Sequence, residues 1–187
     1  MDAFSYLSVL ISIILGLGIT QILTGLGRLL QSRHRTRMYW PSVLWAGLLL
    51  QIDVQAWWSM FGLRHYNDWT FGGFFVVLLQ PITLYLLAAL VLPEFSTADG
   101  VDLETTYYGH ARWFFGLALF LLVVSLSKDL ILNHRLPGAP NLLSHGVFLL
   151  LWTTALVTVN RRAHEVVAVL SQIFGLIYTG MLFAHLT

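Results

Sequence analysis

The chain has 187 residues and a formal net charge of +1, with 57% hydrophobic residues, only 10% charged residues and a mean hydropathy of +0.75. This composition is too apolar for a water-soluble domain of this size, so we expect an integral membrane protein embedded in the lipid bilayer. The near-zero charge and the lack of a basic cluster exclude a nucleic-acid-binding protein, and the absence of cysteine excludes disulfides, thiolate metal sites and thiol catalysis.

Six segments approach the length of about 20 mostly apolar residues that a membrane-spanning helix requires. They cover residues 4–30, 41–63, 72–93, 108–132, 142–159 and 164–186. The segments between them are too short to hold a soluble domain. The sequence therefore predicts an all-α integral membrane protein in which residues 1–187 form a single domain, a compact bundle of six transmembrane helices.

The distribution of basic residues predicts the orientation of this bundle. If the N-terminus is outside, seven of the ten basic residues lie at cytoplasmic ends of spans, as the positive-inside rule requires. Both termini then lie outside. The chain uses nine arginines and one lysine, which is typical of GC-rich bacterial genomes, so we expect a multi-pass protein of a bacterial inner membrane.

The first predicted span contains the stretch GLGITQILTGLG, in which small residues recur. A dinucleotide-binding loop would need a third glycine and a preceding strand. Small residues four apart instead let helices approach closely in lipid. We therefore expect a central or interface helix, with one side against the bundle and the other against the bundle or a second protomer. The predicted packing or self-association residues are Ser12, Gly16, Gly18, Thr20 and Gly25.

Asp53 is the most informative residue, because it falls near the middle of the second predicted span. A charged side chain at that depth costs roughly 3 kcal/mol on insertion scales and so needs a partner, water or a proton. Gln51 and Gln55 share the opposite face of the same helix, about 200° away. The second span is therefore polar on two sides, and we expect other helices to surround it.

Polar residues at similar depth in other spans predict a polar seam through the bundle that conducts an ion or a substrate. Lys128, the single lysine, lies about a turn and a half from Asp53 along the membrane normal. Two arrangements are therefore possible: Lys128 pairs with Asp53, or its side chain reaches outward to the membrane surface. The predicted pathway residues are Asp53, Gln21, Gln51, Gln55, Gln80, Lys128, Asp129 and Gln172.

Four histidines lie at the predicted outer ends, namely His65, His134, His145 and His185. Neutral imidazole binds metals, but these histidines have neither the spacing nor the neighbouring carboxylate of a zinc motif. We therefore expect no cofactor, and an intramembrane metal or redox enzyme using these histidines is the least favoured of three hypotheses.

The leading hypothesis is a transporter or channel for an ion, a proton or a small solute, with Asp53 as its titrating or coordinating group. The competing hypothesis is a non-catalytic homo-oligomeric scaffold, sensor or accessory subunit, whose buried polar groups only fix the register of the helices. Six spans also allow a 3+3 inverted repeat, a common transporter design. The expected partners are the lipid bilayer, a small ion or solute, and a second copy through the first span.

Overall fold

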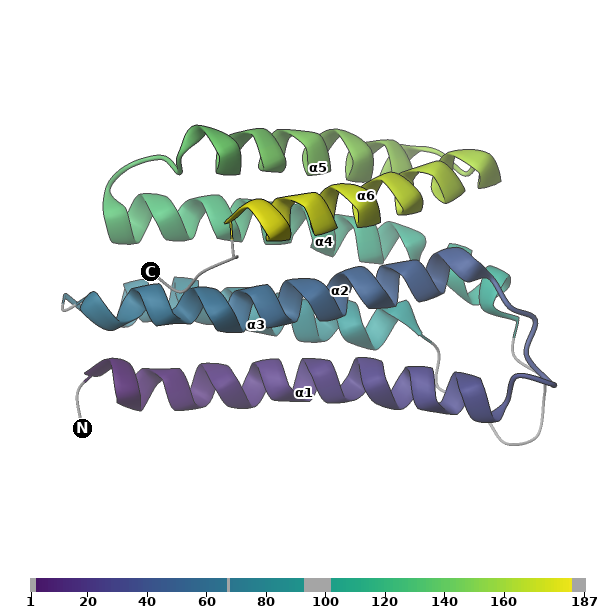
Figure 1. The fold of residues 1–187 in the computed structure, drawn as a ribbon, viewed down its shortest axis with the longest axis horizontal. Coiled ribbons are helices and arrows are strands. Elements are labelled where there is room, and N and C mark those ends of the chain that lie inside the picture. The colour runs from purple at the N-terminus through teal and green to yellow at the C-terminus, as the bar shows by residue number, and fades with distance from the viewer. Residues whose placement is uncertain (1–2, 67, 93–101, 183–187) are drawn as a thin grey trace.

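The computed structural model describes residues 3–66, 68–92 and 102–182, and over these residues it consists of helices joined by short connections (Figure 1). The helices lie within a few residues of the six predicted spans, with the second span, 41–63, divided into an α-helix and a 3-10 helix. The predicted ends of the third and last spans, at residues 93 and 186, lie outside the described residues. The elements are α1 (Ala3–Gln31), α2 (Trp40–Ser59), the 3-10 helix η1 (Met60–His65), α3 (Phe71–Val91), α4 (Leu103–Asn133), α5 (Ala139–Val157) and α6 (Arg161–Leu182).

Five of these helices, α1, α3, α4, α5 and α6, are long and apolar enough to cross a membrane. α2 has 20 residues, which is sufficient length, but Gln51, Asp53 and Gln55 make it less apolar than its neighbours. The membrane-embedded character of the chain is therefore supported by five helices. A sixth span at α2 and the 3+3 inverted repeat stay predictions.

Local chemistry sets the starts of several helices. Thr70 caps α3, because its hydroxyl accepts a hydrogen bond from the third backbone N–H of the helix at 3.1 Å. Asp102 caps α4 in the same way, accepting from the N–H of Glu104 at 2.9 Å. α2 and α5 each have a proline in the first turn, where the missing N–H leaves no bond unmade.

Successive helices run in opposite directions, so α1 begins and α6 ends at the same end of the bundle (Figure 1). α2 packs against α3, α3 against α4, α4 against α5, α5 against α6, and α6 back against α2. These five helices therefore form a closed ring. We call the end where α4 ends and α5 begins the terminal end, and the end where α4 and α6 begin the opposite end.

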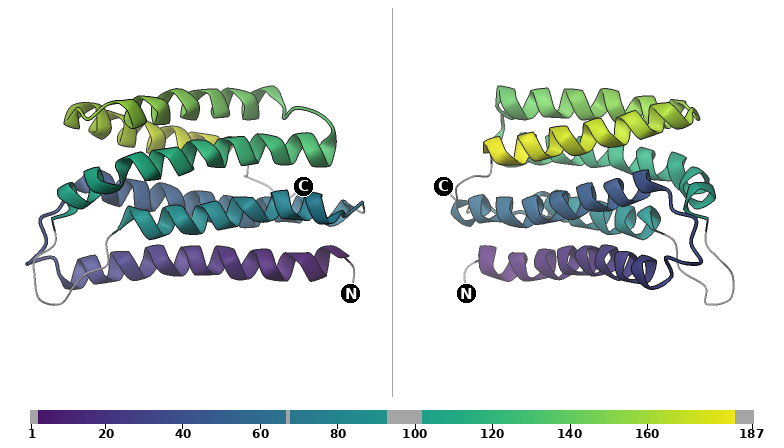
Figure 2. Two further views of the ribbon diagram at one scale, coloured as in Figure 1. Left: turned by 180° about the vertical axis from the view of Figure 1, so that it is seen from behind. Right: turned by 45° about the vertical axis from the view of Figure 1, so that its right-hand side comes forward.

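α1 lies outside this ring, along the edge of the bundle, against α2 and α3 (Figures 1 and 2). Of the two predicted roles for this helix, central or at an interface, the central one is not found, and contact with a second protomer stays a prediction. A Cβ atom at Gly18 would contact Asp53 and the backbone at Tyr85, and one at Gly25 would meet Leu92, so these glycines face the bundle. Gly16 has no neighbour within 4 Å, and this side of α1 is covered by no other described helix.

Candidate functional site: a polar cavity inside the helix ring

A cavity of about 410 Å³ lies inside the ring and is lined by side chains from all five of its helices. It extends from the middle of α2, at Leu48, toward the terminal end, where α5 begins. A space of this size is in the range that holds a small molecule. Its polar lining consists of Gln51, Gln55, Ser59, Gln80, Ser125, Lys128, Asp129, Asn141, Ser144, His145 and Tyr178.

Lys128 brings a positive charge into the wall formed by α3 and α4. Its Nζ donates a hydrogen bond to Oε1 of Gln80 at 2.9 Å. An ammonium group has three N–H donors, so Lys128 keeps donors for a group in the cavity. Asp129 and His145 line the same space, and the cavity therefore combines positive, negative and neutral polar groups.

The wall between α2 and α6 is built around the hydroxyl of Thr179. This oxygen accepts a hydrogen bond from Nε2 of Gln51 at 2.6 Å and another from Nε2 of Gln55, and it donates to the carbonyl of Gly175 at 2.8 Å. A hydroxyl has one donor and two acceptor positions, so Thr179 is fully used. Gln172 extends the network by donating to Oε1 of Gln51 at 3.2 Å.

The wall between α5 and α6 is built around Asn141, in the first turn of α5. Its Oδ1 accepts a hydrogen bond from the hydroxyl of Tyr178. Its carbonyl lies 2.7 Å from Oγ of Ser144 and 2.7 Å from Nδ1 of His145. The sequence interpretation missed Asn141 and Ser125, although the Pro140–Asn141 pair at a helix start was a signal that a polar residue is fixed there.

Asp53 lies outside this cavity, on the face of α2 that meets α1 and α3. Its side chain is 0% exposed, and neither carboxyl oxygen has a hydrogen-bond partner. Its oxygens lie opposite Gly18 of α1. Lys128 donates to Gln80 instead, so the Asp53–Lys128 pair that the sequence left open is not formed.

The predicted pathway residues therefore divide into two groups. Gln51, Gln55, Gln80, Lys128 and Asp129 line the cavity, and Gln172 belongs to the wall beside it. Asp53 and Gln21, by contrast, lie away from the cavity, the first in the α1–α2–α3 interface and the second on α1. One polar seam through the bundle was the expectation, but Asp53 and Gln21 do not line the cavity that the other members share.

Aromatic side chains fill the ring on the other side of the cavity. Trp45 of α2 lies edge-on against Phe114 and Phe115 of α4, with ring centroids 5.5 and 5.2 Å apart. All three residues are buried. Trp152 of α5, also buried, lies between the cavity and α6, where its Nε1 is 3.3 Å from Oγ of Ser171. Of these four residues Trp152 lines the cavity, and the packed layer of Trp45, Phe114 and Phe115 lies farther toward the opposite end.

Beyond this layer, His164 of α6 is buried and makes two hydrogen bonds. Its Nε2 lies 2.9 Å from the carbonyl of Thr158, and its Nδ1 lies 2.9 Å from the hydroxyl of Tyr107. Because a carbonyl only accepts, Nε2 donates to Thr158, and Nδ1 is left to the hydroxyl of Tyr107. The burial of His164 was not predicted from the sequence.

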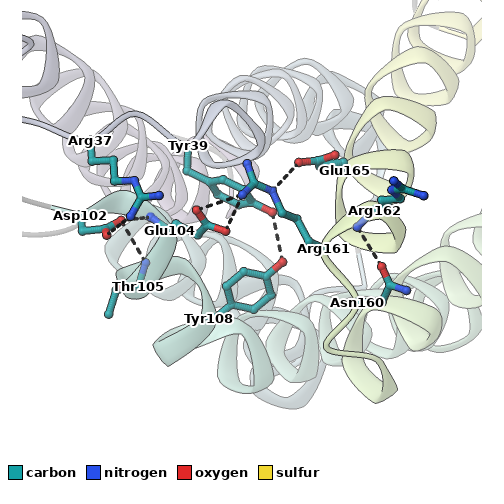
Figure 3. Close-up of polar contacts among 10 residues, drawn as sticks. All are labelled: Arg37, Tyr39, Asp102, Glu104, Thr105, Tyr108, Asn160, Arg161, Arg162 and Glu165. Carbon is teal, nitrogen blue, oxygen red and sulfur yellow. Dashed lines mark hydrogen bonds and ion pairs between the residues drawn. The ribbon is translucent and has the colours of Figure 1, made fainter.

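Ion pairs join α4 and α6 at the opposite end (Figure 3). Arg161 lies between two carboxylates, 3.1 Å from Glu104 of α4 and 2.9 Å from Glu165 of its own helix. The hydroxyl of Tyr39 is 3.3 Å from that of Tyr108, and burial together with this hydrogen bond raises the pKa of Tyr39. This cluster was not predicted, because its members are distant in the sequence.

Arg37 and Asp102 tie the α1–α2 connection to the start of α4, with 3.3 Å between Nη1 and Oδ2 (Figure 3). Partial desolvation raises the pKa of Asp102. The hydrogen bonds from the N–H groups of Thr105 and Glu104 and the charge of Arg37 outweigh that effect, so the pKa lies below its ordinary value. Asp102 is therefore an ionised cap.

The histidines considered for a metal site are dispersed. Among the described residues, no three His, Asp or Glu side chains lie close enough together to hold a metal ion. His145 lines the cavity, whereas His65 follows α2 and His134 follows α4. His185 lies outside the described residues.

We compared the chain with protein-family models, with curated proteins and with solved structures, and none of the three comparisons found a match. Function has therefore to be inferred from the chemistry of the residues. The described part of the chain belongs to a membrane-embedded helical protein, with a polar cavity inside a ring of five helices and an ion-paired opposite end.

Proposed function

We propose that the protein is a small membrane transporter that binds a polar solute in the cavity inside its helix ring. The observation that carries this proposal is a lining of Gln, Ser, Asn, Lys and Asp side chains from four helices, with Tyr178 from the fifth, in a chain otherwise dominated by apolar residues. Polar groups inside a membrane protein are costly, and they usually mark a substrate or ion path.

The shape of the cavity favours a transporter over an open channel. A channel needs a continuous path, whereas this cavity extends toward the terminal end and is bounded on the other side by Leu48, Leu121 and Trp152, with the buried Trp45, Phe114 and Phe115 farther toward the opposite end. We infer a state that accepts solute from the terminal side. Release would require opening at the opposite end, between α4 and α6.

The contacts at the opposite end are weak enough to open and close. The side chain of Arg161 is 57% exposed where it meets Glu104, and ion pairs this exposed contribute about 0–1 kcal/mol each. Breaking the Arg161–Glu104 pair therefore costs little compared with the burial of the aromatic layer. Such pairs suit a reversible closure.

Asp53 is the group that we propose to couple a proton to this cycle. An ionised carboxylate against Gly18 would be uncompensated, so the packed arrangement of α1, α2 and α3 fits the uncharged form. α2 carries Asp53 on one face and Gln51 and Gln55 on the other. Loss of the proton would loosen the first face and shift the cavity wall on the second.

We place the protein in a bacterial inner membrane with α2 as a sixth span and both termini outside, on the basis of its arginine usage and its distribution of basic residues. The terminal end, to which the cavity extends, is then the outer end. A ligand sensor would use the same cavity without a release step, and uptake measurements separate the two functions.

The test is uptake by liposomes that contain the purified protein, with radiolabelled probes of four kinds: a monocarboxylate, a dicarboxylate, an amino acid and sodium. We expect one class to accumulate, Lys128→Met to abolish that uptake, and Asp53→Asn to abolish it or to uncouple it from a proton gradient. Arg135→Met, in the exposed α4–α5 connection, is the control and should transport normally. Saturable binding without uptake would favour a sensor, and neither binding nor uptake would favour the scaffold.

A further inference from the structure

A second hollow lies on the outside of the ring, between α2 and α6, with a volume of about 470 Å³. Its sides are formed by Leu50, Val54, Trp58 and Leu176. Val54 is 49% exposed and Leu176 is 57% exposed, so the hollow opens on the face that would meet lipid. We call it the α2–α6 groove.

The α2–α6 groove and the cavity share one wall. Gln51 and Gln55 line both spaces, and the hydroxyl of Thr179, which both amides contact, also lines the groove. The separation at this point consists of side chains joined by hydrogen bonds. Opening of this wall therefore requires exchange of the rotamers of Gln51 and Gln55.

We propose that the solute is a single-chain amphiphile with an anionic head group, such as a fatty acid, whose head binds at Lys128 while its hydrocarbon chain passes between α2 and α6 into the groove. This inference rests on the proposed function and specifies the substrate class. It joins a polar space and an apolar, lipid-facing space that lie side by side, as the two parts of an amphiphile require.

The charges of the cavity favour a head group with a single negative charge. Lys128 donates to the neutral Gln80, so its remaining donors suit a carboxylate. Asp129 lines the same cavity and would repel a second negative charge. A chain without a head group would leave Lys128 and the glutamines unused, and a polar solute without a chain would leave the groove to lipid.

Photo-crosslinking tests this inference directly. The probe is a 14-carbon fatty acid with a diazirine at the chain end, added to the full-length protein in lipid nanodiscs, with the labelled residues located by mass spectrometry. We expect labels on α2 and α6 around Val54 and Leu176. Octanoate should compete for these labels, whereas acetate should compete far less.

Two pairs of variants make the test specific. Lys128→Met should reduce the groove labels about tenfold, as expected for the loss of a charged hydrogen bond, and Lys128→Arg should restore them. Gly47→Phe should fill the groove and remove the labels, because a Cβ there would find only Gln172, at 3.8 Å. Gly16→Phe places the same side chain on the outer face of α1 and should leave the labels unchanged.

Three results would overturn the inference. Labels spread evenly over lipid-facing helices and unaffected by Lys128→Met would show ordinary lipid contact. Acetate competing as well as octanoate would mean that the cavity binds a polar solute and that the chain contributes nothing, which leaves the proposed function standing. Dimers cross-linked through Leu176→Cys, with no probe in the groove, would assign the groove to a second copy of the chain.

Discussion

Replacing Asp53 by valine should stabilise the protein. Both carboxyl oxygens are buried without a hydrogen-bond partner, and a buried polar group in that state costs about 1–3 kcal/mol. Valine is apolar and similar in size, and although its methyl groups lie one bond closer to the backbone than the carboxyl oxygens, it removes the unpaired oxygens opposite Gly18. We expect the free energy of unfolding to rise by about 1–3 kcal/mol, while proton-coupled uptake is lost.

The assay measures the free energy of unfolding in bicelles by steric trapping. The wild type, Asp53→Val and Asp53→Asn are measured side by side. The asparagine variant keeps unpaired polar atoms at the same position and should therefore stay close to the wild type. A valine variant less stable than the wild type by more than about 1 kcal/mol would refute the reasoning, since it would mean that Asp53 has a stabilising partner. Substitutions at functional sites commonly raise stability while they remove activity, and Asp53→Val is expected to do the same.

Three further predictions concern α1 and the opposite end. Gly18→Leu should lower the free energy of unfolding by about 1–3 kcal/mol, because the added side chain meets Asp53 and the backbone of α3. Gly16→Leu, with open space around it, should leave that free energy unchanged in the same thermal unfolding experiment. Arg161→Gln should release the link between α4 and α6 and speed hydrogen exchange at the first turn of α6. Arg162→Gln is the control and should leave this exchange unchanged. Equal exchange rates in the two variants would contradict the role of the ion pairs. Asp102 has a pKa below its ordinary value of 3.8, so its contribution to α4 is complete above that value and is lost as the pH falls through the lowered folded pKa. The protection of amides at the start of α4, measured as the exchange rate relative to that of an unfolded chain at the same pH, should therefore fall only in strong acid, whereas Asp102→Ala, which removes the cap, should lower this protection at every pH above that acid range.

The helices themselves were predictable, because long apolar segments and the residues that end them are local properties of a sequence. The bounds of α3, for example, follow from the apolar run after Thr70 and the cap that Thr70 provides. The limit was α2, where Gln51, Asp53 and Gln55 make a polar helix whose surroundings no local pattern reveals. The two polar faces of α2 were expected. The face with Gln51 and Gln55 meets the cavity, and the face with Asp53 meets α1 and α3.

The grouping of polar residues was harder to predict, because it depends on which helices are neighbours. Depth in the membrane suggested that Asp53 and Lys128 could pair, but α2 turns Asp53 toward α1 while Lys128 faces the ring. The small residues of the first span predicted close contact, and Gly18 makes it. Because small residues occur on both sides of the helix, their spacing left open whether α1 lies at the centre or at the edge of the bundle.

The central claim is that the cavity is open from the terminal end and closed toward the opposite end. The chain contains no cysteine, so a single introduced thiol reports on one position. Ser125 lines the cavity, whereas Ser171 is fully buried beside Trp152. We would label Ser125→Cys and Ser171→Cys in sealed vesicles with a membrane-impermeant thiol reagent. The account predicts that Ser125→Cys reacts from the terminal side alone and that Ser171→Cys stays unreactive from both sides. A Ser125→Cys thiol that is unreactive from the terminal side, or that reacts from the opposite side, would contradict it.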